Sequence, residues 1–302
     1  MKEYLSQMQG EIKNIDGKVK QLEAQARLVT ALKNYDGEDR LISSLEILER
    51  IKTQPEETKF ITGIEGLDKI LGGFRENQLI VLAAPTKSGK TQMCIELTIR
   101  MPTTNPVWVP FEESAEELIR KFHDRGEIPP LFYSPLTIAG NTVAWVEKRI
   151  VEGIVKFNSK LFFIDHLHFI IPFSSDRLDT RIGQVMRDLK AIAKRNKITI
   201  VLICHLKKTN VEVTPSLEDL RDSSFVAQEA DTVIMLWRET SRDPQGDVMI
   251  SNNITLSVQA NRRTGATGNV KMVYANGRYL EFDWKHGDKV EDIVKVHKAW
   301  KG

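Results

Sequence analysis

The chain has 302 residues, of which 41% are hydrophobic and 28% charged, and its formal net charge at pH 7 is +2. This length and composition are typical of one large α/β domain with an extension. The near balance of charge excludes a generally basic surface, so a nucleic-acid site in this chain would have to be local.

The sequence shows no sign of a membrane or secreted protein. Residues 1–6 lack the apolar core of a signal peptide, and no apolar stretch reaches the length of a membrane span. Cys94 and Cys204 fall in a predicted helix and a predicted strand, which favours two buried free thiols over a disulfide. No Cys/His cluster has the spacing of a zinc site. We therefore expect a cytoplasmic protein with no membrane partner.

Residues 1–35 are predicted to form a helix with a heptad pattern. Apolar residues recur at alternating spacings of three and four, and Lys, Glu and Gln fill most other positions. The recurring residues are Leu5, Met8, Ile12, Ile15, Val19, Leu22, Ala26 and Val29. Gly10 and Gly17 each weaken such a helix by about 1 kcal/mol. The pattern fits a helix that pairs in an oligomer, and equally one that packs on the core of its own chain.

A second amphipathic segment is predicted at 41–52, followed by a linker at 53–57. Its apolar face carries Leu41, Leu45, Leu48 and Ile51. We expect a helical extension at 1–55 that could serve oligomerisation, a main domain at 56–283 and a tail at 284–302.

Predicted strands and helices alternate through the main domain. The strands are expected at 79–84, 106–110, 161–165, 198–204, 232–237, 254–259, 269–275 and 278–282. The helices are expected near 65–72, 90–100, 114–125, 143–157 and 179–196. Continuous apolar strands that alternate with helices predict a mostly parallel sheet covered on both faces. Asn276 and Gly277 separate the last two strands, which favours an antiparallel hairpin.

The segment APTKSGKT at 84–91 is the strongest indication of function. It lies between an apolar strand and a helix, which is the setting of a phosphate-binding loop, although Ala84 stands where a glycine is usual. Backbone N–H groups and the helix N-terminus would bind the phosphates of ATP. Lys90 would reach the β- and γ-phosphates, and the Thr91 hydroxyl would bind Mg²⁺. The candidate nucleotide-binding residues are Ala84, Pro85, Thr86, Lys87, Ser88, Gly89, Lys90 and Thr91.

Three other predicted strands end in polar residues, and ligands bind at the carboxyl ends of parallel strands. Asp165 ends one strand and would hold Mg²⁺ beside Thr91. Glu112 and Glu113 follow another, and either could polarise the attacking water as a general base. His205 ends the third and could contact the γ-phosphate.

Two features leave local alternatives open. Ser114 and Glu117 resemble a capping box, so Glu113 could pair with the start of the next helix instead. Arg262 and Arg263 lie in a glycine-containing turn, which is either a solvated turn or the source of an arginine finger for a neighbour's nucleotide.

From about residue 62 to residue 283, these segments resemble the RecA-like motor domain of DnaB-type hexameric replicative helicases. The resemblance implies a RecA-like P-loop NTPase fold, with Glu112 as catalytic glutamate, Asp165 as Mg²⁺ ligand and Arg262 as arginine finger. His205 resembles the phosphate sensor of phage primase-helicases and of the mitochondrial helicase Twinkle. Ala260 stands at the family's second finger position, which is usually lysine, and a one-residue shift would exchange Arg262 and Arg263.

The resemblance further implies an ATP-driven ring that moves 5′→3′ along single-stranded DNA in replication. ATP and Mg²⁺ are the implied cofactors, a homo-hexamer the implied assembly, and a primase or loader a candidate partner. A phage- or plasmid-encoded origin would fit. DNA is expected to pass the loops 206–216 and 219–225. The implied DNA-binding residues are Lys207, Lys208, Arg221, Asp222 and Ser224.

Two other classes of function stay open. One is a RecA-like ATPase without unwinding activity, such as a recombination mediator or a KaiC-like regulator. The other is an adaptor or loader that hydrolyses ATP poorly, which the missing lysine at position 260 allows. The segment from Asp219 to Arg221, together with the arginine turn, favours the helicase.

Overall fold

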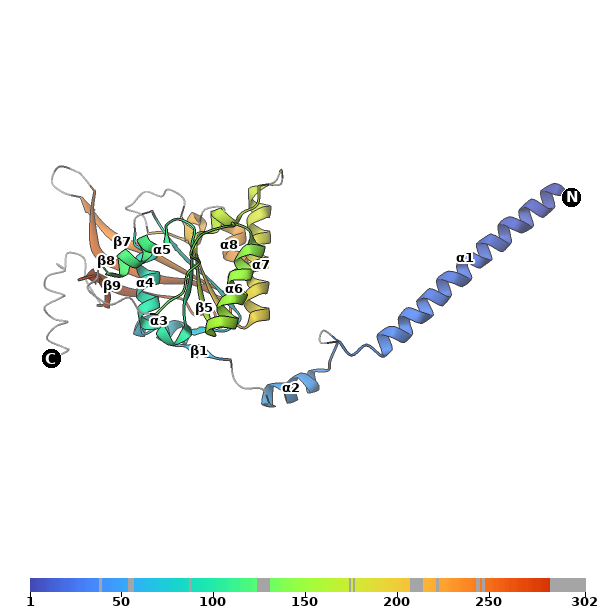
Figure 1. Cartoon of the computed structure of the whole chain (residues 1–302), viewed down its shortest axis with the longest axis horizontal. Helices are drawn as coiled ribbons and strands as arrows, with labels where there is room; N and C mark the ends of the chain where they lie inside the picture. Colours follow the sequence, from blue (N-terminus) through green and yellow to red (C-terminus); the bar gives the residue numbers. More distant parts are fainter. Residues whose placement is uncertain are drawn as a thin grey trace. The chain divides into compact units, whose positions relative to one another are not determined.

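In the computed structural model of the protein, the described residues are 1–37, 40–53, 57–86, 88–123, 131–173, 175, 177–206, 214–220, 223–242, 245 and 248–282. The chain divides into two compact units, Met1–Glu56 and Glu57–Gly302 (Figure 1). The predicted tail at 284–302 and most of the predicted linker lie outside the described residues.

The first unit contains the two predicted helices. Helix α1 (Lys2–Lys33) is a single continuous helix, and α2 (Ser44–Thr53) covers most of the second amphipathic segment. The Ser43 hydroxyl accepts a hydrogen bond from the backbone N–H of Glu46 (3.1 Å) and so satisfies one free donor at the start of α2. Among the described residues, no helix combines the length and the hydrophobicity needed to cross a membrane.

The second unit alternates strands and helices, as predicted. Its helices are α3 (Glu65–Leu71), α4 (Lys90–Arg100), α5 (Ala115–His123), α6 (Val143–Phe157), α7 (Leu178–Asn196) and α8 (Ser223–Glu229), with short 3₁₀ turns η1 (Pro102–Thr104), η2 (Leu167–Ile170) and η3 (Leu217–Asp219). The strands are β1 (Lys59–Phe60), β2 (Phe74–Arg75), β3 (Gln78–Ala84), β4 (Val107–Pro110), β5 (Leu161–Asp165), β6 (Thr199–His205), β7 (Thr232–Arg242), β8 (Val248–Asn261), β9 (Gly268–Ala275) and β10 (Arg278–Glu281).

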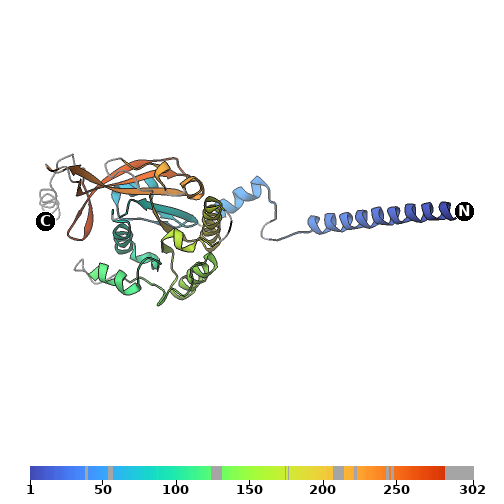
Figure 2. The ribbon, with the colours of Figure 1, turned by 90° about the horizontal axis from the view of Figure 1, so that it is seen from above.

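The main sheet has eight strands in the order β10-β9-β8-β7-β3-β6-β5-β4. The strands from β7 to β4 pair in parallel, because each connection between them crosses over. From β7 to β10 the pairing is antiparallel, and Figure 2 shows these C-terminal strands (orange to brown) side by side. The mostly parallel sheet predicted from the alternation is therefore confirmed.

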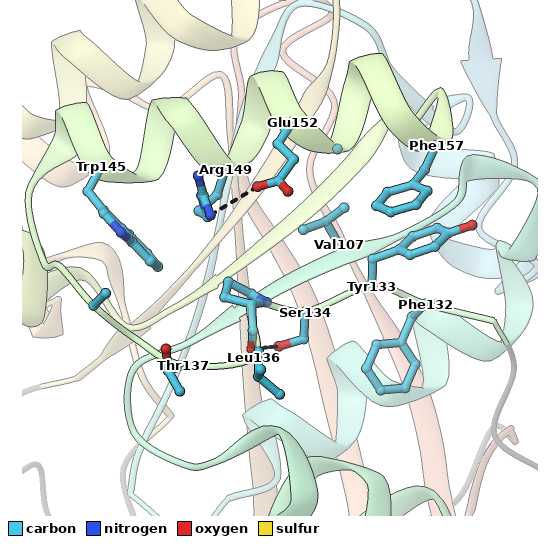
Figure 3. A pocket seen from close by; sticks show the side chains of 13 residues that line it. Val107, Phe132, Tyr133, Ser134, Leu136, Thr137, Trp145, Arg149, Glu152 and Phe157 are labelled. Atoms are coloured by element: carbon cyan, nitrogen blue, oxygen red, sulfur yellow. Dashed lines mark hydrogen bonds and ion pairs between the residues drawn. The ribbon is translucent and has the colours of Figure 1, made fainter.

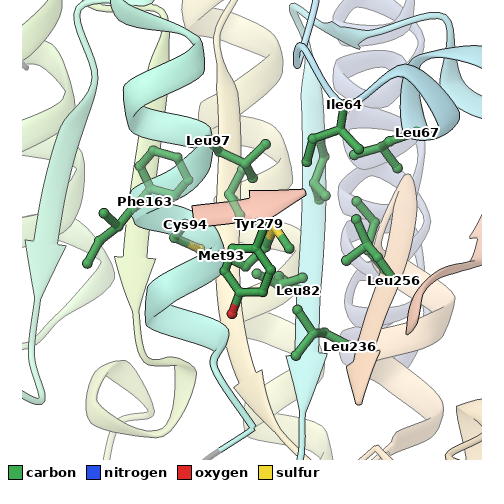
Figure 4. Close-up of a cluster of buried hydrophobic side chains, with 14 of the residues drawn as sticks. Ile64, Leu67, Leu82, Met93, Cys94, Leu97, Phe163, Leu236, Leu256 and Tyr279 are labelled. Atoms are coloured by element: carbon green, nitrogen blue, oxygen red, sulfur yellow. The ribbon is translucent and has the colours of Figure 1, made fainter. Parts of the chain in front are cut away.

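Strand β3 shows how both faces of the sheet are buried. Ile80, Leu82 and Ala84 contribute to the core under α3, α4 and α5 (Figure 4). Leu79, Val81 and Ala83 point to the opposite core, under α6, α7 and α8. Side chains alternate along a strand, so an uninterrupted apolar run is what a strand covered on both faces requires.

The structure differs from the sequence prediction in β7 and β8, in α8, and in the short paired strands β1 and β2, which the sequence analysis does not predict. Strands β7 and β8 extend well beyond the predicted 232–237 and 254–259. The prediction stops short because the sequences of these outer parts lack a continuous apolar run. The predicted loop 219–225 is not one loop, because α8 begins at Ser223. Phe225 of α8 packs against Gly183 of α7, where an added Cβ would lie 3.0 Å from the ring. This packing stabilises a short helix that its own sequence signals only weakly.

The last two strands form the predicted hairpin. Asn276 and Gly277 both have positive φ, 51° and 76°, as a tight two-residue turn between antiparallel strands requires. This turn places Tyr279 of β10 beside the N-terminus of α4, where its hydroxyl donates a hydrogen bond to the Gly89 carbonyl (3.1 Å).

Candidate nucleotide-binding site

The loop between β3 and α4 has the backbone of a phosphate-binding loop. Gly89, the residue before α4, has a φ of +99°, and a Cβ there would lie 2.5 Å from the Tyr279 hydroxyl. Both the backbone conformation and the close approach therefore require glycine. The Ser88 N–H donates to the Pro85 carbonyl (3.2 Å), which closes the turn. Lys87 lies outside the described residues.

Lys90 is the first residue of α4, and its ammonium group is enclosed by the loop that precedes it. The side chain donates to the carbonyls of Ala84 (3.2 Å) and Pro85 (3.3 Å), and its Nζ lies 2.9 Å from Nδ1 of His205. Burial lowers the pKa of Lys90, because it disfavours the charged form, while the nearby Asp165 and Glu112 oppose this shift. A nucleotide phosphate would therefore supply the charge partner that the carbonyls only partly replace.

His205 connects Lys90 to Glu112. Its Nε2 lies 3.0 Å from Oε1 of Glu112, on the opposite side of the ring from Lys90. An ammonium group can only donate, so a neutral His205 accepts at Nδ1 and donates from Nε2 to the carboxylate. Burial acts to raise the pKa of Glu112, but the hydrogen bond from His205, together with the nearby His166 and Lys90, outweighs it, and the pKa lies below its usual value.

The structure separates the two adjacent glutamates. Glu112 points to the histidines, whereas Glu113 forms an ion pair with Lys121 of α5. Ser114 and Glu117 form the predicted capping box, in which the Ser114 N–H donates to Glu117 (2.9 Å) and the Glu117 N–H donates to the Ser114 hydroxyl (3.2 Å). Glu113 thus pairs with the following helix through Lys121, not through the cap.

Asp165 lies at the end of β5, with its carboxylate 3.4 Å from the Thr91 hydroxyl. It is 1% exposed, and among the described residues its Oδ1 has no hydrogen-bond partner. Burial, and then the negative charges of Glu112 and Glu113, raise the pKa of Asp165 to about 7. A buried carboxylate oxygen without a partner, beside a hydroxyl, is a donor set that fits Mg²⁺.

His166 is a site residue that the sequence reasoning missed. It is buried, its Nε2 lies 3.6 Å from Oε1 of Glu112, and its ring meets that of His205 edge to face at 4.5 Å. Burial, and then the nearby His205, lower the pKa of His166 to about 4. The available signal was its position directly after Asp165, at the edge of the sheet where the other polar residues gather.

The arginine turn contains two exposed arginines, of which one forms an ion pair. Arg263 forms an ion pair with Glu57 and thereby lowers the pKa of that carboxyl group. Arg262 is exposed, and within the described part of the chain its guanidinium forms no hydrogen bond or ion pair, although its backbone N–H donates to the Asp231 carbonyl (2.9 Å). Ala260 packs against the core, so no cation replaces the lysine there.

The predicted DNA-binding residues are largely outside the described structure. Lys207, Lys208, Arg221 and Asp222 are not described, nor is the side chain of Ser224, which belongs to α8 rather than to a loop. Leu206 and Leu220, the last described residues before the segments 207–213 and 221–222, form an isolated antiparallel bridge.

A separate cavity of about 530 Å³ lies beside β4 and α6 (Figure 3). Tyr133 and Phe157 stack on one side of it at 3.7 Å, and Arg149 pairs with Glu152 on α6 (3.0 Å). None of the predicted site residues lines this cavity.

Comparison with known proteins gives a consistent result. Residues 137–283 match the model of the DnaB-like helicase C terminal domain, and residues 60–127 match the KaiC ATPase model. The replicative DNA helicase DnaB of Haemophilus influenzae is 23% identical over 280 residues, covering 80% of this chain and 58% of that protein. The replicative DNA helicase DnaC of Bacillus subtilis is 22% identical over 286 residues, covering 83% and 62%. The chain thus spans less than two thirds of the length of these relatives.

Two solved structures share the fold. One is described as an ATPase domain and matches with a TM-score of 0.64 and 18% identity, covering 79% of this chain and 97% of that chain. A DnaB-like replicative helicase, whose structure was described together with its interactions with primase, matches with a TM-score of 0.66 and 18% identity, covering 90% and 75%. The resemblance to DnaB-type motor domains and the RecA-like fold are therefore confirmed.

Proposed function

We propose that this chain is the motor part of an ATP-hydrolysing, ring-forming helicase that moves along single-stranded DNA, 5′→3′, during replication. The observation that carries this proposal is the chain of contacts from Lys90 through His205 to Glu112, beside Thr91 and Asp165. It connects a phosphate-binding cation to a candidate general base.

The described side chains have complementary tasks in ATP hydrolysis. Lys90 and the loop amides bind the phosphates, and Thr91 and Asp165 would hold Mg²⁺, which would neutralise charge on the phosphate oxygens. Glu112 accepts the proton of the attacking water, and the His205 N–H orients that carboxylate. A bound γ-phosphate is an anion that both His205 and Lys90 can contact. Because His205 ends β6, binding of the phosphate can change the position of the segment that follows this strand.

A ring assembly is proposed because the exposed Arg262 has no partner among the described residues of its own chain. In trans it would stabilise the charge that develops on a neighbour's γ-phosphate. Six subunits, single-stranded DNA and a primase or loader are the proposed assembly and partners. The primase proposal is supported by the described interaction of one structural neighbour with primase.

A second candidate function is a RecA-like ATPase that does not unwind DNA. The match of residues 60–127 to the KaiC model favours it, because this segment includes the phosphate loop and Glu112. A poorly hydrolysing adaptor or loader is a third.

Steady-state ATP hydrolysis with and without single-stranded DNA, combined with unwinding of forked duplexes, separates these functions. A helicase hydrolyses ATP faster with DNA and unwinds the fork by its 5′ tail, while Glu112→Gln does neither. DNA stimulation without unwinding supports the second candidate, and hydrolysis that stays near background supports the third. Either result contradicts the helicase proposal.

A further inference from the structure

Helix α1 carries a stripe of apolar side chains that no described residue of its own unit, 1–56, covers. Leu5, Ile15, Leu22 and Val29 are 55%, 60%, 64% and 51% exposed. So long an apolar stripe along one helix indicates a missing partner rather than scattered surface residues.

The stripe repeats every seven residues through four heptads. The a positions are Leu5, Ile12, Val19 and Ala26, and the d positions are Met8, Ile15, Leu22 and Val29. A repeat averaging 3.5 residues keeps one seam facing a helix that winds around it, whereas a straight helix drifts from such a repeat by about 20° per heptad. The partner that fits this stripe is therefore another helix, not a globular surface.

The glycines of α1 are placed away from this seam. Gly10 and Gly17 both occupy the f position, opposite the seam, and a Cβ at either would meet nothing within 4 Å. They interrupt no seam contact, but each weakens an isolated helix by about 1 kcal/mol. Most of the stability of a helix in a protein comes from packing, so α1 needs a partner along its seam.

We propose that α1 pairs, parallel and in register, with α1 of a second copy of this chain. In this arrangement Lys18 at g faces Glu23 at e of the second copy, on both sides of the seam. One like-charged approach, Glu11 to Asp16, opposes it. The antiparallel arrangement with the same apolar layers sets Lys18 against Lys18 and Asp16 against Asp16, with no attractive pair.

The symmetry of a ring also favours the parallel arrangement of the α1 helices. Subunits related by a cyclic axis hold their helices with the same polarity, so neighbouring α1 helices can meet in parallel; in a ring of six this gives three pairs related by a three-fold axis. This argument alone rests on the proposed ring-forming function, whereas the heptads and the charges do not.

Cysteine cross-linking of the full chain tests the pairing. Val19→Cys places a thiol at an a position, Gln21→Cys places one at the outward c position, and the native Cys94 and Cys204 are buried. With mild oxidant at low protein concentration, we expect a disulfide-linked dimer for Val19→Cys, with at least tenfold less for Gln21→Cys. That factor is an order-of-magnitude expectation from the contact geometry that a disulfide needs. Equal cross-linking of both variants, or of neither, would overturn the proposal.

Two further measurements complete the test. If Val19→Cys cross-links only when mixed with Ile15→Cys, the helices run antiparallel and the proposed direction is wrong. The double variant with Ile15→Glu and Leu22→Glu should lose the helical circular dichroism that α1 contributes. Its signal should also no longer depend on protein concentration. The control double variant, Asn14→Glu with Gln21→Glu, adds the same charge outside the seam. It should keep both the helical signal and its dependence on protein concentration. If the two double variants behave alike, the seam has no role. None of these readouts needs ATP hydrolysis, so their failure and that of the proposed motor function are distinguishable.

Discussion

Nε2 of His205 lies 3.0 Å from Oε1 of Glu112, while Nδ1 of the same ring lies 2.9 Å from the Lys90 ammonium. One imidazole thus contacts both the residue that would bind the γ-phosphate and the residue that would activate water. A change of charge at the phosphate position can therefore affect Glu112 through the His205 side chain alone.

The role of His205 can be tested with glutamine, because its amide can also accept from Lys90 and donate to Glu112. We expect His205→Gln to keep most ATP turnover and His205→Ala to lose it, with nucleotide affinity little changed in both. Turnover and fluorescent-nucleotide titration measure the two effects. If His205→Ala hydrolyses ATP at the wild-type rate, the contact has no function in catalysis.

Lys90→Ala should weaken ATP binding by about 10- to 100-fold, since charge-assisted hydrogen bonds contribute about 1.5–3 kcal/mol. Titration with a fluorescent ATP analogue measures this affinity. Lys156→Ala is the control, because that lysine pairs with Glu152 on the exposed face of α6. An unchanged affinity in Lys90→Ala would show that the loop does not bind phosphate as proposed.

Glu112→Gln should bind ATP normally but lose turnover by about 10²- to 10⁴-fold, because only proton acceptance is removed. Glu113→Gln is the matched control: it breaks the ion pair with Lys121 but leaves the contact with His205 intact. Single-turnover hydrolysis separates chemistry from product release. The reverse pattern, with Glu113 required and Glu112 dispensable, would shift the assignment by one residue.

Arg262→Ala should keep ATP binding and lose about 10³-fold or more in turnover, if this arginine acts in trans on developing charge. Arg263→Ala should lose less turnover and reduce stability by less than about 1 kcal/mol, because its ion pair with Glu57 is exposed. We still expect Arg263 to contribute more than in relatives, since Ala260 supplies no second cation.

Mixing Arg262→Ala chains with Lys90→Ala chains should restore some turnover, because mixed interfaces can join an intact loop to an intact arginine. The decisive comparison is the monomer. A wild-type monomer that hydrolyses ATP at the rate of the assembly would contradict a finger supplied by a neighbour.

The pH dependence of the protein's stability should reflect the ionisation of the Asp165 carboxyl group. Its folded pKa of about 7 exceeds the usual value near 4, so between these values the folded state holds a proton that the unfolded chain has released. Stability from this group therefore falls as pH rises from about 4 to about 7. His166, whose pKa is lowered to about 4, acts with the opposite sign up to about pH 6.5.

The informative quantity is therefore the difference between wild type and Asp165→Asn, which removes only one of the two groups. Melting temperatures without nucleotide and with EDTA should fall in wild type, relative to Asp165→Asn, between about pH 4 and about pH 7. A difference that does not change with pH would show that Asp165 is ionised throughout this range.

The sequence alone predicts the parallel part of the sheet, the phosphate loop and the final hairpin. These features depend on residues close together in the chain: the apolar run of β3, Gly89 before α4, and Asn276 with Gly277. Hydrophobic periodicity and turn chemistry act over such short distances, so they can be read without the fold.

Which side chains near these motifs contact one another depends on the tertiary fold. Glu112 rather than Glu113 contacts His205, and Arg263 rather than Arg262 pairs with Glu57, because in each case the partner lies far away in the sequence. His166 joins Glu112 and His205, with three ligand-type atoms within 4.8 Å of one another, although their spacing resembles no metal motif. Such contacts arise where the carboxyl ends of β4, β5 and β6 come together in the sheet, and no local pattern encodes which side chains will meet there.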